Sequence, residues 1–315
     1  MLTFLGRRMA MLVVTMAVAS AVVFIVLEVL PGDPALLILG VNAQDDTLAA
    51  LRAEMGFDRP PLERYLTWVA GLLTGHMGKS HTYAVPVAEL VGARLAITVP
   101  LALMAFVLST AIAVPLGMFA ATRHNRLGDY GVMAFSQIGI AVPEFWFGIL
   151  MVLLFAVTLG WLPAGGFAGW EAGVGPALRS LILPATALAV SQAAILARIT
   201  RSAVLETLGA DFVRTARAKG VGEGAILFRH VLRNAAIPMV TILGLQLAFL
   251  LGGVIVVENV FTLPGLGRLV YLAVSQRDVI VVRDVVVLLV AMVVVVNFLV
   301  DVAYVLIDPR PKVET

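Results

Sequence analysis

Six long stretches of apolar residues dominate this 315-residue sequence. Each is close to the roughly 20 residues that an α-helix needs to cross a bilayer. Three of them contain a single acidic residue, and none contains a lysine or arginine. We therefore expect an all-α polytopic membrane protein with six transmembrane helices. The stretches are 9–30, 95–122, 130–160, 180–197, 234–257 and 285–307.

The composition agrees with a membrane protein and excludes several kinds of functional site. Charged residues make up 13% of the chain and hydrophobic residues 61%, whereas soluble domains carry about 25% charged residues. The chain has no cysteine, which excludes disulfides and thiolate metal sites. The net charge of +2 gives no indication of nucleic-acid binding.

The first apolar stretch is expected to remain in the protein as a helix. Arg7 and Arg8 precede it, as basic residues precede a signal peptide. The stretch is too long for the apolar part of such a peptide. It is followed by Pro-Gly-Asp-Pro at 31–34 rather than by a small-residue cleavage site.

Lysine and arginine counts in the loops set the expected orientation, because cytoplasmic loops carry the excess of these residues. The side that holds both termini carries 13 of them and the other side 9, of which 5 lie in the long segment 31–94. Long segments count for little in this rule. We therefore expect cytoplasmic termini and three parts: 1–30 with the first helix, an external helical segment 31–94, and a five-helix core 95–315 with a cytoplasmic loop at 198–235.

The external segment is expected to form two short helices. One covers 46–55 and ends at Gly56, and the other covers 61–73 and ends near Gly75. The run Gly75-His-Met-Gly-Lys-Ser80 resembles a phosphate-binding loop, but Leu73 stands where the first glycine would be needed. We interpret it as a glycine-rich turn.

A basic segment, 209–238, lies between the fourth and fifth apolar stretches. Gly209 and Gly220 enclose a nine-residue piece, 211–219, with helix signals. Asp211 is expected to cap its start, and Gly220 to end it in the left-handed conformation. So short a helix is marginal in water, and we expect it to become stable by docking on something else. The charged residues of the segment are Asp211, Arg214, Arg217, Lys219, Glu223, Arg229 and Arg233.

The third apolar stretch contains Pro143 and Glu144 near its middle. The proline is expected to kink the helix. A carboxylate inside a membrane usually faces a cavity or a partner group. Glu144 is therefore either a residue that lines a transport path or a hydrogen-bonded residue that packs helices together.

Other polar residues within the apolar stretches leave the same two interpretations open. Gln192 and Gln246 could line an aqueous path or form hydrogen bonds between helices. Asn297 and Asp301 lie four residues apart on one face of the last helix, where they could line the path or pack. The apolar run 258–267 could turn back into the protein as a re-entrant segment.

No catalytic motif is present. The sequence lacks a nucleotide-binding Walker A motif and the motifs of zinc proteases and serine hydrolases. We expect no metal site, no catalytic residue and no enzyme activity in this chain. Two alternatives use Glu144 and Asp301: a proton-coupled secondary transporter, with the pair as a proton relay, and a membrane enzyme, with the pair as acid and base.

The basic segment resembles the cytoplasmic loop of ABC-transporter permeases, within the branch that imports dipeptides, oligopeptides and nickel. The matching runs are 210–220 and 230–238. The general permease signature is Glu-Ala-Ala with a glycine four residues later. Here the triplet is Arg214-Thr-Ala216 with Gly220, and the distance from Gly220 to Pro238 is longer, as in this branch. Further similar stretches are 1–35, 75–80, 161–163, 252–253 with Glu258, 264–267, 301–304 and 308–310. The segment 276–280, in contrast, lacks the proline expected after Asp278.

The resemblance implies a type I ABC importer permease in the bacterial plasma (inner) membrane. This chain and a homologous second permease would form the path in the lipid bilayer. Two cytoplasmic ATPase subunits would bind ATP and Mg, so that this chain itself holds no cofactor, and an external substrate-binding protein would deliver the cargo. The 211–219 helix would be the coupling helix. Its implied contact residues for an ATPase subunit are Asp211, Arg214, Thr215, Ala216, Arg217, Lys219 and Gly220.

The cargo implied by the resemblance is a di- or oligopeptide. A nickel–chelator complex or another small cargo of the same branch is the alternative. The resemblance involves no nucleic acid.

Overall fold

The computed structural model describes residues 2–29, 36, 39, 44–54 and 58–307. Within these residues the elements are helices, and the pairing of Lys79 with Pro86 is a single isolated bridge. This confirms the predicted all-α class. The Pro-Gly-Asp-Pro run at 31–34, the helix end at Gly56 and the stretch 308–310 lie outside the described residues.

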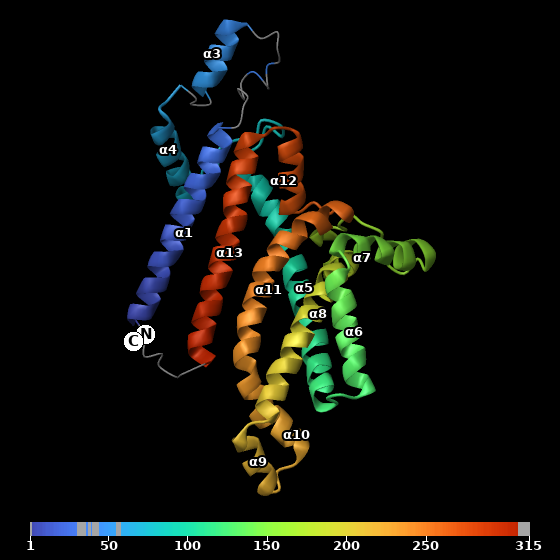
Figure 1. Ribbon diagram of the computed structural model, residues 1–315. Coiled ribbons are helices and arrows are strands. Elements are labelled where there is room, and N and C mark those ends of the chain that lie inside the picture. The colour runs from blue at the N-terminus through green and yellow to red at the C-terminus, as the bar shows by residue number, and fades with distance from the viewer. Residues whose placement is uncertain (1, 30–35, 37–38, 40–43, 55–57, 308–315) are drawn as a thin grey trace. The chain divides into compact units, whose positions relative to one another are not determined.

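Figure 1 shows the helices in chain order. They are α1 (Leu2–Val29), α3 (Asp45–Glu54), α4 (Pro61–Thr74), α5 (Val87–Thr122), α6 (Leu127–Ala141), α7 (Glu144–Met151), the π-helix η1 (Val152–Thr158), the short 3-10 helix η2 (Trp170–Ala172), α8 (Val174–Leu208), α9 (Asp211–Ala218), α10 (Glu223–Ala225), the π-helix η3 (Ile226–Val231), α11 (Leu232–Val260), α12 (Leu266–Ser275) and α13 (Val279–Ile307).

Five of the described helical stretches are long and apolar enough to cross a membrane, and a sixth span results if one bent pair is counted. The five belong to α1, α5, α8, α13 and the continuous run from α10 to α11. The bent pair is α6 with the α7–η1 arm. The described chain therefore has five to six apolar spans, and the predicted six are reached when the bent pair counts as one span.

The third span breaks at Pro143 instead of only kinking there. The helix axis bends by 102° between its two arms, Leu127–Ala141 and Glu144–Thr158. The cause is local, because the residue before a proline is pushed out of the α-helical region. Val142 accordingly has an extended backbone with φ −85° and ψ 122°, and Pro143 continues it with ψ 135°. Glu144 is thus the first residue of a new helix.

The chain divides into two compact units. The larger consists of Val99–Leu263 with Val295–Thr315, and α8 is its central helix. Of the residues in the most apolar part of α8, 72% are buried, against 11–39% for the other four straight spans. Small residues allow the close packing around it. A Cβ on Gly117 of α5, for example, would lie 2.6 Å from the backbone oxygen of Ala197 in α8.

The smaller unit consists of Met1–Thr98 with Pro264–Val294. An aromatic cluster of Phe24 from α1 with Tyr65 and Trp68 from α4 packs against Val287 of α13. The indole nitrogen of Trp68 also donates a 2.7 Å hydrogen bond to the fully buried carboxylate of Asp284. These contacts fix α4 to two of the apolar spans.

The two short helices predicted in the first loop are observed, as α3 and α4. As predicted, α4 ends at Gly75, which adopts the left-handed conformation with φ +80°. The turn that follows is fixed by Asp278, whose carboxylate accepts hydrogen bonds from the Ser80 hydroxyl and the Thr82 amide. The same carboxylate accepts from the amide of Val281 and so begins α13 without the expected proline.

Candidate functional site

The basic segment forms a hairpin end that joins α8 to α11 and carries α9 at its tip (Figure 1). The predicted helix 211–219 is observed as Asp211–Ala218. Its end is a Schellman motif: the amide of Val221 bonds to the oxygen of Ala216 at 3.1 Å, and that of Gly220 to the oxygen of Arg217 at 2.9 Å. Gly220 has φ +76°, the left-handed conformation predicted for it.

The start of α9 differs from the prediction. Ala210 occupies the N-cap position and no side chain caps the helix, so the prediction that Asp211 is the cap was wrong. Asp211 is instead the first helical residue, and its carboxylate accepts a hydrogen bond from Arg214 one turn later. This ion pair competes with capping for the same carboxylate.

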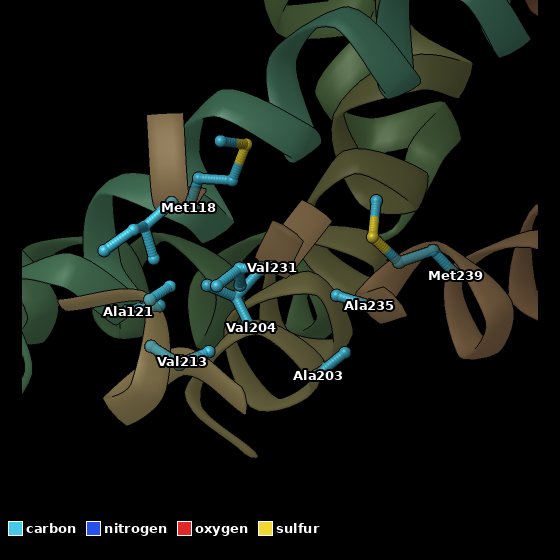
Figure 2. Close-up of a cluster of buried hydrophobic side chains, with 10 residues drawn as sticks. Met118, Ala121, Ala203, Val204, Val213, Val231, Ala235 and Met239 are labelled. Atoms are coloured by element: carbon cyan, nitrogen blue, oxygen red, sulfur yellow. The ribbon is translucent and has the colours of Figure 1, made fainter. Parts of the chain in front are cut away.

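One face of α9 is buried in the hairpin. Val213 and Ala216, three residues apart, enter an apolar cluster together with side chains from the ends of α5, α8 and α11 (Figure 2). Val221, just beyond the helix, packs against the same cluster. The buried members are Met118, Ala121, Ala203, Val204, Val213, Ala216, Ile226, Val231, Ala235 and Met239.

The opposite face of α9 is exposed and carries paired charges. Arg217 donates two hydrogen bonds to Glu223, at 2.7 and 3.1 Å. This contact raises the pKa of the Arg217 guanidinium above its usual value, so the residue stays charged. Lys219 forms no ion pair within the described chain. The exposed face also includes Phe212 and Thr215.

Glu144 lies at the helix break, where three helices meet. Its carboxylate accepts a 2.5 Å hydrogen bond from the hydroxyl of Ser191 in α8. The other carboxylate oxygen lies against α11, only 2.8 Å from where a Cβ on Gly253 would stand. Glu144 is half-buried. The break therefore points a carboxylate into the contact between α8 and α11.

Gln192 and Gln246 are brought together by the same two helices. Gln246 donates a 2.5 Å hydrogen bond from its side-chain nitrogen to the backbone oxygen of Gln192. Both side chains are buried, and the side-chain oxygen of each has no hydrogen-bond partner in the described chain. In α13, the Asn297 side chain is exposed and that of Asp301 half-buried. No hydrogen bond between described residues joins Asn297 to Glu144, Gln192 or Gln246.

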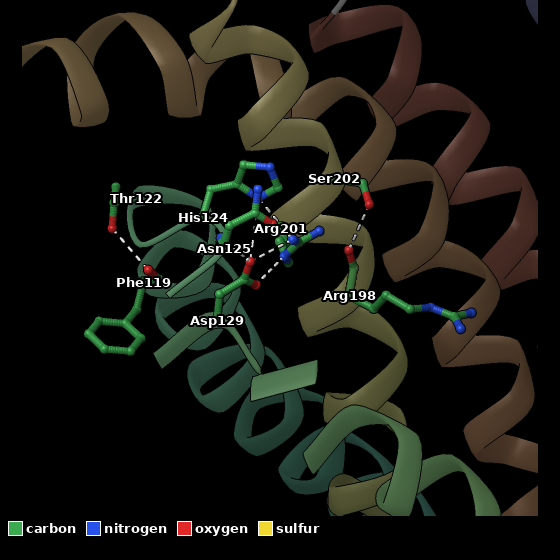
Figure 3. A network of polar contacts seen from close by, with 8 residues as sticks. All are labelled: Phe119, Thr122, His124, Asn125, Asp129, Arg198, Arg201 and Ser202. Carbon is green, nitrogen blue, oxygen red and sulfur yellow. Dashed lines mark hydrogen bonds and ion pairs between the residues drawn. The ribbon is translucent and has the colours of Figure 1, made fainter. Parts of the chain in front are cut away.

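A further polar cluster, which no sequence motif indicated, joins α6 to α8 (Figure 3). Arg201 donates to both carboxylate oxygens of Asp129, and the backbone amide of Asn125 donates to one of them at 2.9 Å. His124 lies beside the pair, with Nδ1 3.4 Å from the carboxylate. The Asp129 side chain is only 2% exposed. In the sequence, this cluster is indicated only by Asp129, the single acidic residue in a turn that contains Arg123 and Arg126.

Comparison with known proteins covers almost the whole chain. Residues 113–313 match the family model described as "Binding-protein-dependent transport system inner membrane component", and residues 1–102 match the corresponding N-terminal model. A putative peptide transport system permease protein of Brucella abortus (strain 2308) is 39% identical over 97% of this chain and 98% of its own length. The oligopeptide transport system permease protein AppB of Bacillus subtilis (strain 168) is 37% identical over 98% of this chain and 99% of its own length.

A solved structure supports the fold. A chain from a structure titled as inward-facing conformations of the MetNI methionine ABC transporter aligns with a TM-score of 0.60 and 21% identity, over 70% of this chain and 97% of that chain. With the family models, this places the chain among multi-pass inner-membrane proteins. The apolar spans, the hairpin end with α9 and these matches lead to one conclusion: the chain belongs to the family of inner-membrane permease components of binding-protein-dependent ABC importers.

Proposed function

We propose that this permease subunit imports peptides together with a homologous second permease. An external substrate-binding protein delivers the peptide, and two cytoplasmic ATPase subunits bind ATP and Mg and power the transport. The peptide cargo is supported by the relatives named as peptide and oligopeptide permeases, which match this chain over nearly its whole length. The proposed orientation has both termini and the 198–235 loop in the cytoplasm and the 31–94 segment outside, in keeping with the lysine and arginine counts.

The two-faced structure of α9 is the observation that carries this proposal. An eight-residue helix has little stability of its own, yet here Val213 and Ala216 attach it to the ends of long apolar helices. Its other face presents Asp211, Arg214, Thr215, Arg217 and Lys219 to solvent. We infer that this exposed face docks on an ATPase subunit. A displacement of α9 would then pass directly to α8 and α11.

The docking proposal can be tested by crosslinking, because the chain contains no cysteine of its own. In the assembled complex, Thr215→Cys on the exposed face of α9 is expected to crosslink to an ATPase subunit. Ser202→Cys, which is exposed on α8 before the hairpin end, serves as the control and is expected not to. Absence of a crosslink from position 215 in an active complex would refute docking through this face.

The coupling role requires a second measurement. We expect Arg217→Glu to leave assembly and ATP binding intact and to reduce stimulation of ATP hydrolysis by cargo in reconstituted vesicles. Arg217→Glu also places a second carboxylate beside Glu223, whereas Arg217→Gln removes the positive charge without this repulsion and serves as the milder variant. Full cargo stimulation in both variants would show that this face does not transmit the signal.

We propose that Glu144 borders the transport path, since it is half-buried at a helix break and is held by Ser191. The hydrogen bond from Gln246 to Gln192 supports a packing role for these two residues. Asn297 and Asp301 remain predicted path residues on one face of α13.

The cargo is tested by uptake into vesicles that contain the complete complex. Labelled di- and oligopeptides are expected to accumulate only when ATP is present on the side of the ATPase subunits, and unlabelled peptide is expected to compete. Uptake of a nickel–chelator complex but not of peptide would select the alternative cargo. Uptake driven by a proton gradient without ATP would instead select a secondary transporter.

A further inference from the structure

One face of α4 (Pro61–Thr74) is apolar and uncovered in the described part of the protein. Leu62, Leu66 and Leu73 are 70%, 58% and 84% exposed. Their spacing of four and seven residues places them in a single row along the helix. We call this row the leucine stripe. An exposed row of leucines needs an apolar environment, because exposed apolar patches in proteins usually mark contact with another protein or a membrane.

A second face holds α4 to apolar spans. Trp68 is 6% exposed and stacks on Phe24 of α1, with ring centroids 6.0 Å apart. Its indole nitrogen is hydrogen-bonded to Asp284, and the guanidinium of Arg283 lies 4.6 Å from its ring centroid. Tyr65, one turn earlier, shares a 2.9 Å hydrogen bond with Ser20. Contacts to both α1 and α13 fix the position of α4 along them.

These contacts place α4 at the depth of the bilayer. Ser20 lies seven residues inside the end of the apolar span Gly6–Leu27, which is about 10 Å at 1.5 Å per residue. Asp284 and Val287 lie five and eight residues inside α13, or about 8 and 12 Å. The hydrocarbon core of a bilayer is about 30 Å thick. Trp68, which contacts Phe24 inside the span of α1 and Asp284 just before the apolar stretch 285–307, therefore lies near the outer boundary of that core.

The third face of α4 is polar. Glu63, Thr67 and Thr74 are exposed and lie roughly 100° around the helix from the leucine stripe, since each residue turns an α-helix by that angle. Glu63 pairs with Arg59 at 3.6 Å. An apolar face beside a polar face, at the depth of the acyl-chain boundary, is the pattern of helices that lie in a membrane interface.

We propose that α4 is an interfacial helix whose leucine stripe inserts among the lipid acyl chains of the leaflet at the C-terminal end of α1. The occupant is lipid because α1 itself is a lipid-facing span. Only 11% of its apolar part is buried, and Val14, Val18 and Ile25 are 58–61% exposed. The leucine stripe lies on a helix that packs on the C-terminal half of this lipid-facing span, through Ser20 and Phe24. The first loop is therefore not wholly extramembranous.

The test uses two neighbouring positions of α4 in the otherwise cysteine-free full-length protein, reconstituted in vesicles. Leu66→Cys lies in the leucine stripe and Thr67→Cys in the polar face, and both are labelled with bimane. Lipids brominated on their acyl chains should quench the label at position 66 about threefold more than at position 67. Aqueous iodide should show the opposite preference.

Two results would overturn the proposal. Quenching by iodide that is as strong at position 66 as at position 67 would mean that the stripe faces water. A label at position 66 that neither quencher reaches would mean that a protein surface covers the stripe. Leu73→Cys provides a second stripe position, also exposed, so that a folding defect in one variant does not decide the outcome.

Discussion

Arg201 of α8 donates hydrogen bonds to both carboxylate oxygens of Asp129, the third residue of α6, so that a two-pronged ion pair joins the start of α6 to α8. The Asp129 side chain is 2% exposed and that of Arg201 17%. Residues 72 positions apart are thereby held together at the end of two apolar helices. Removing one partner of an ion pair this buried destabilises a protein strongly, because the other charge stays buried without a counter-ion.

We predict that Asp129→Ala lowers the free energy of unfolding by about 3 kcal/mol, because Arg201 would keep its charge in a largely buried place without a counter-ion. Thermal unfolding of the purified protein measures this change. Arg198→Ala is the matched control, since Arg198 is exposed one turn earlier on α8, and should change stability by less than about 0.5 kcal/mol. A double variant, Asp129→Ala with Arg201→Met, should regain part of the loss. Equal effects of Asp129→Ala and Arg198→Ala would show that the pair contributes nothing.

A methyl group on Gly117 should separate α5 from α8. It would stand 2.6 Å from the oxygen of Ala197 and equally close to the Cβ of Thr200, and backbone atoms cannot move aside as flexible side chains can. We expect Gly117→Ala to destabilise the protein by about 1–3 kcal/mol. Gly131→Ala in α6 meets no atom within 4 Å and should stabilise the helix by up to about 1 kcal/mol. Opposite signs in thermal unfolding are therefore predicted, and a stable Gly117→Ala variant would contradict the packing described.

Replacement of Glu144 separates its two possible roles. Glu144→Gln keeps a side-chain oxygen for the hydroxyl of Ser191 and removes the charge, so assembly should be normal and cargo transport reduced. Glu144→Leu removes the hydrogen bond as well and should cost about 1 kcal/mol of stability. Uptake by the reconstituted complex and its thermal stability are measured side by side. Normal uptake with Gln, combined with only a stability loss with Leu, would assign Glu144 to helix packing alone.

The end of α9 depends on the backbone of one glycine. Gly220 has φ +76°, and a Cβ added there would have no atom within 4 Å. A substitution at this position would therefore strain the backbone without causing a steric clash. We expect Gly220→Ala to destabilise the hairpin end by about 1–2 kcal/mol and to weaken cargo-stimulated ATP hydrolysis. Gly222 has φ −64° and is the N-cap residue of α10, where alanine is less favourable than glycine, so Gly222→Ala should cost roughly a few tenths of a kcal/mol and less than Gly220→Ala. Identical behaviour of the two variants would contradict the capping motif.

Local features of this fold were predictable because they depend on residues close together in the chain. The helix Asp211–Ala218 follows from two flanking glycines, and the left-handed Gly220 from the absence of a Cβ. The cap was predicted wrongly, because Arg214 offers Asp211 a charged partner and a local rule does not weigh that competition. The position of the Pro143 break was likewise predictable.

Contacts between distant segments were not predictable. The proline explains why the helix breaks at this position. The size of the bend, 102°, depends also on how the two arms pack against α8 and α11. Asp129 and Arg201 stand out in the sequence only as charged residues of two separate loops, since no periodic pattern links positions so far apart. For Gln192 and Gln246, hydrogen bonding between helices was predicted as one of two possible roles. The sequence did not predict that Gln246 would bond to the backbone oxygen of Gln192.

The bent third span also constrains how the protein is made. Each of its arms holds 15 residues, about 22 Å of helix, and so is shorter than the hydrocarbon core of about 30 Å. The amide of Val142 still bonds to the oxygen of Ile138, but Pro143 has no N–H, so a carbonyl of the preceding turn must be covered by protein, because lipid offers no hydrogen-bond partner. Ala194 of α8 packs on the first arm, and Ala187 of α8 packs on the second arm together with Phe261. All three residues are synthesised after the third span. We therefore expect stable insertion of the third span to require α8, which follows it in the chain.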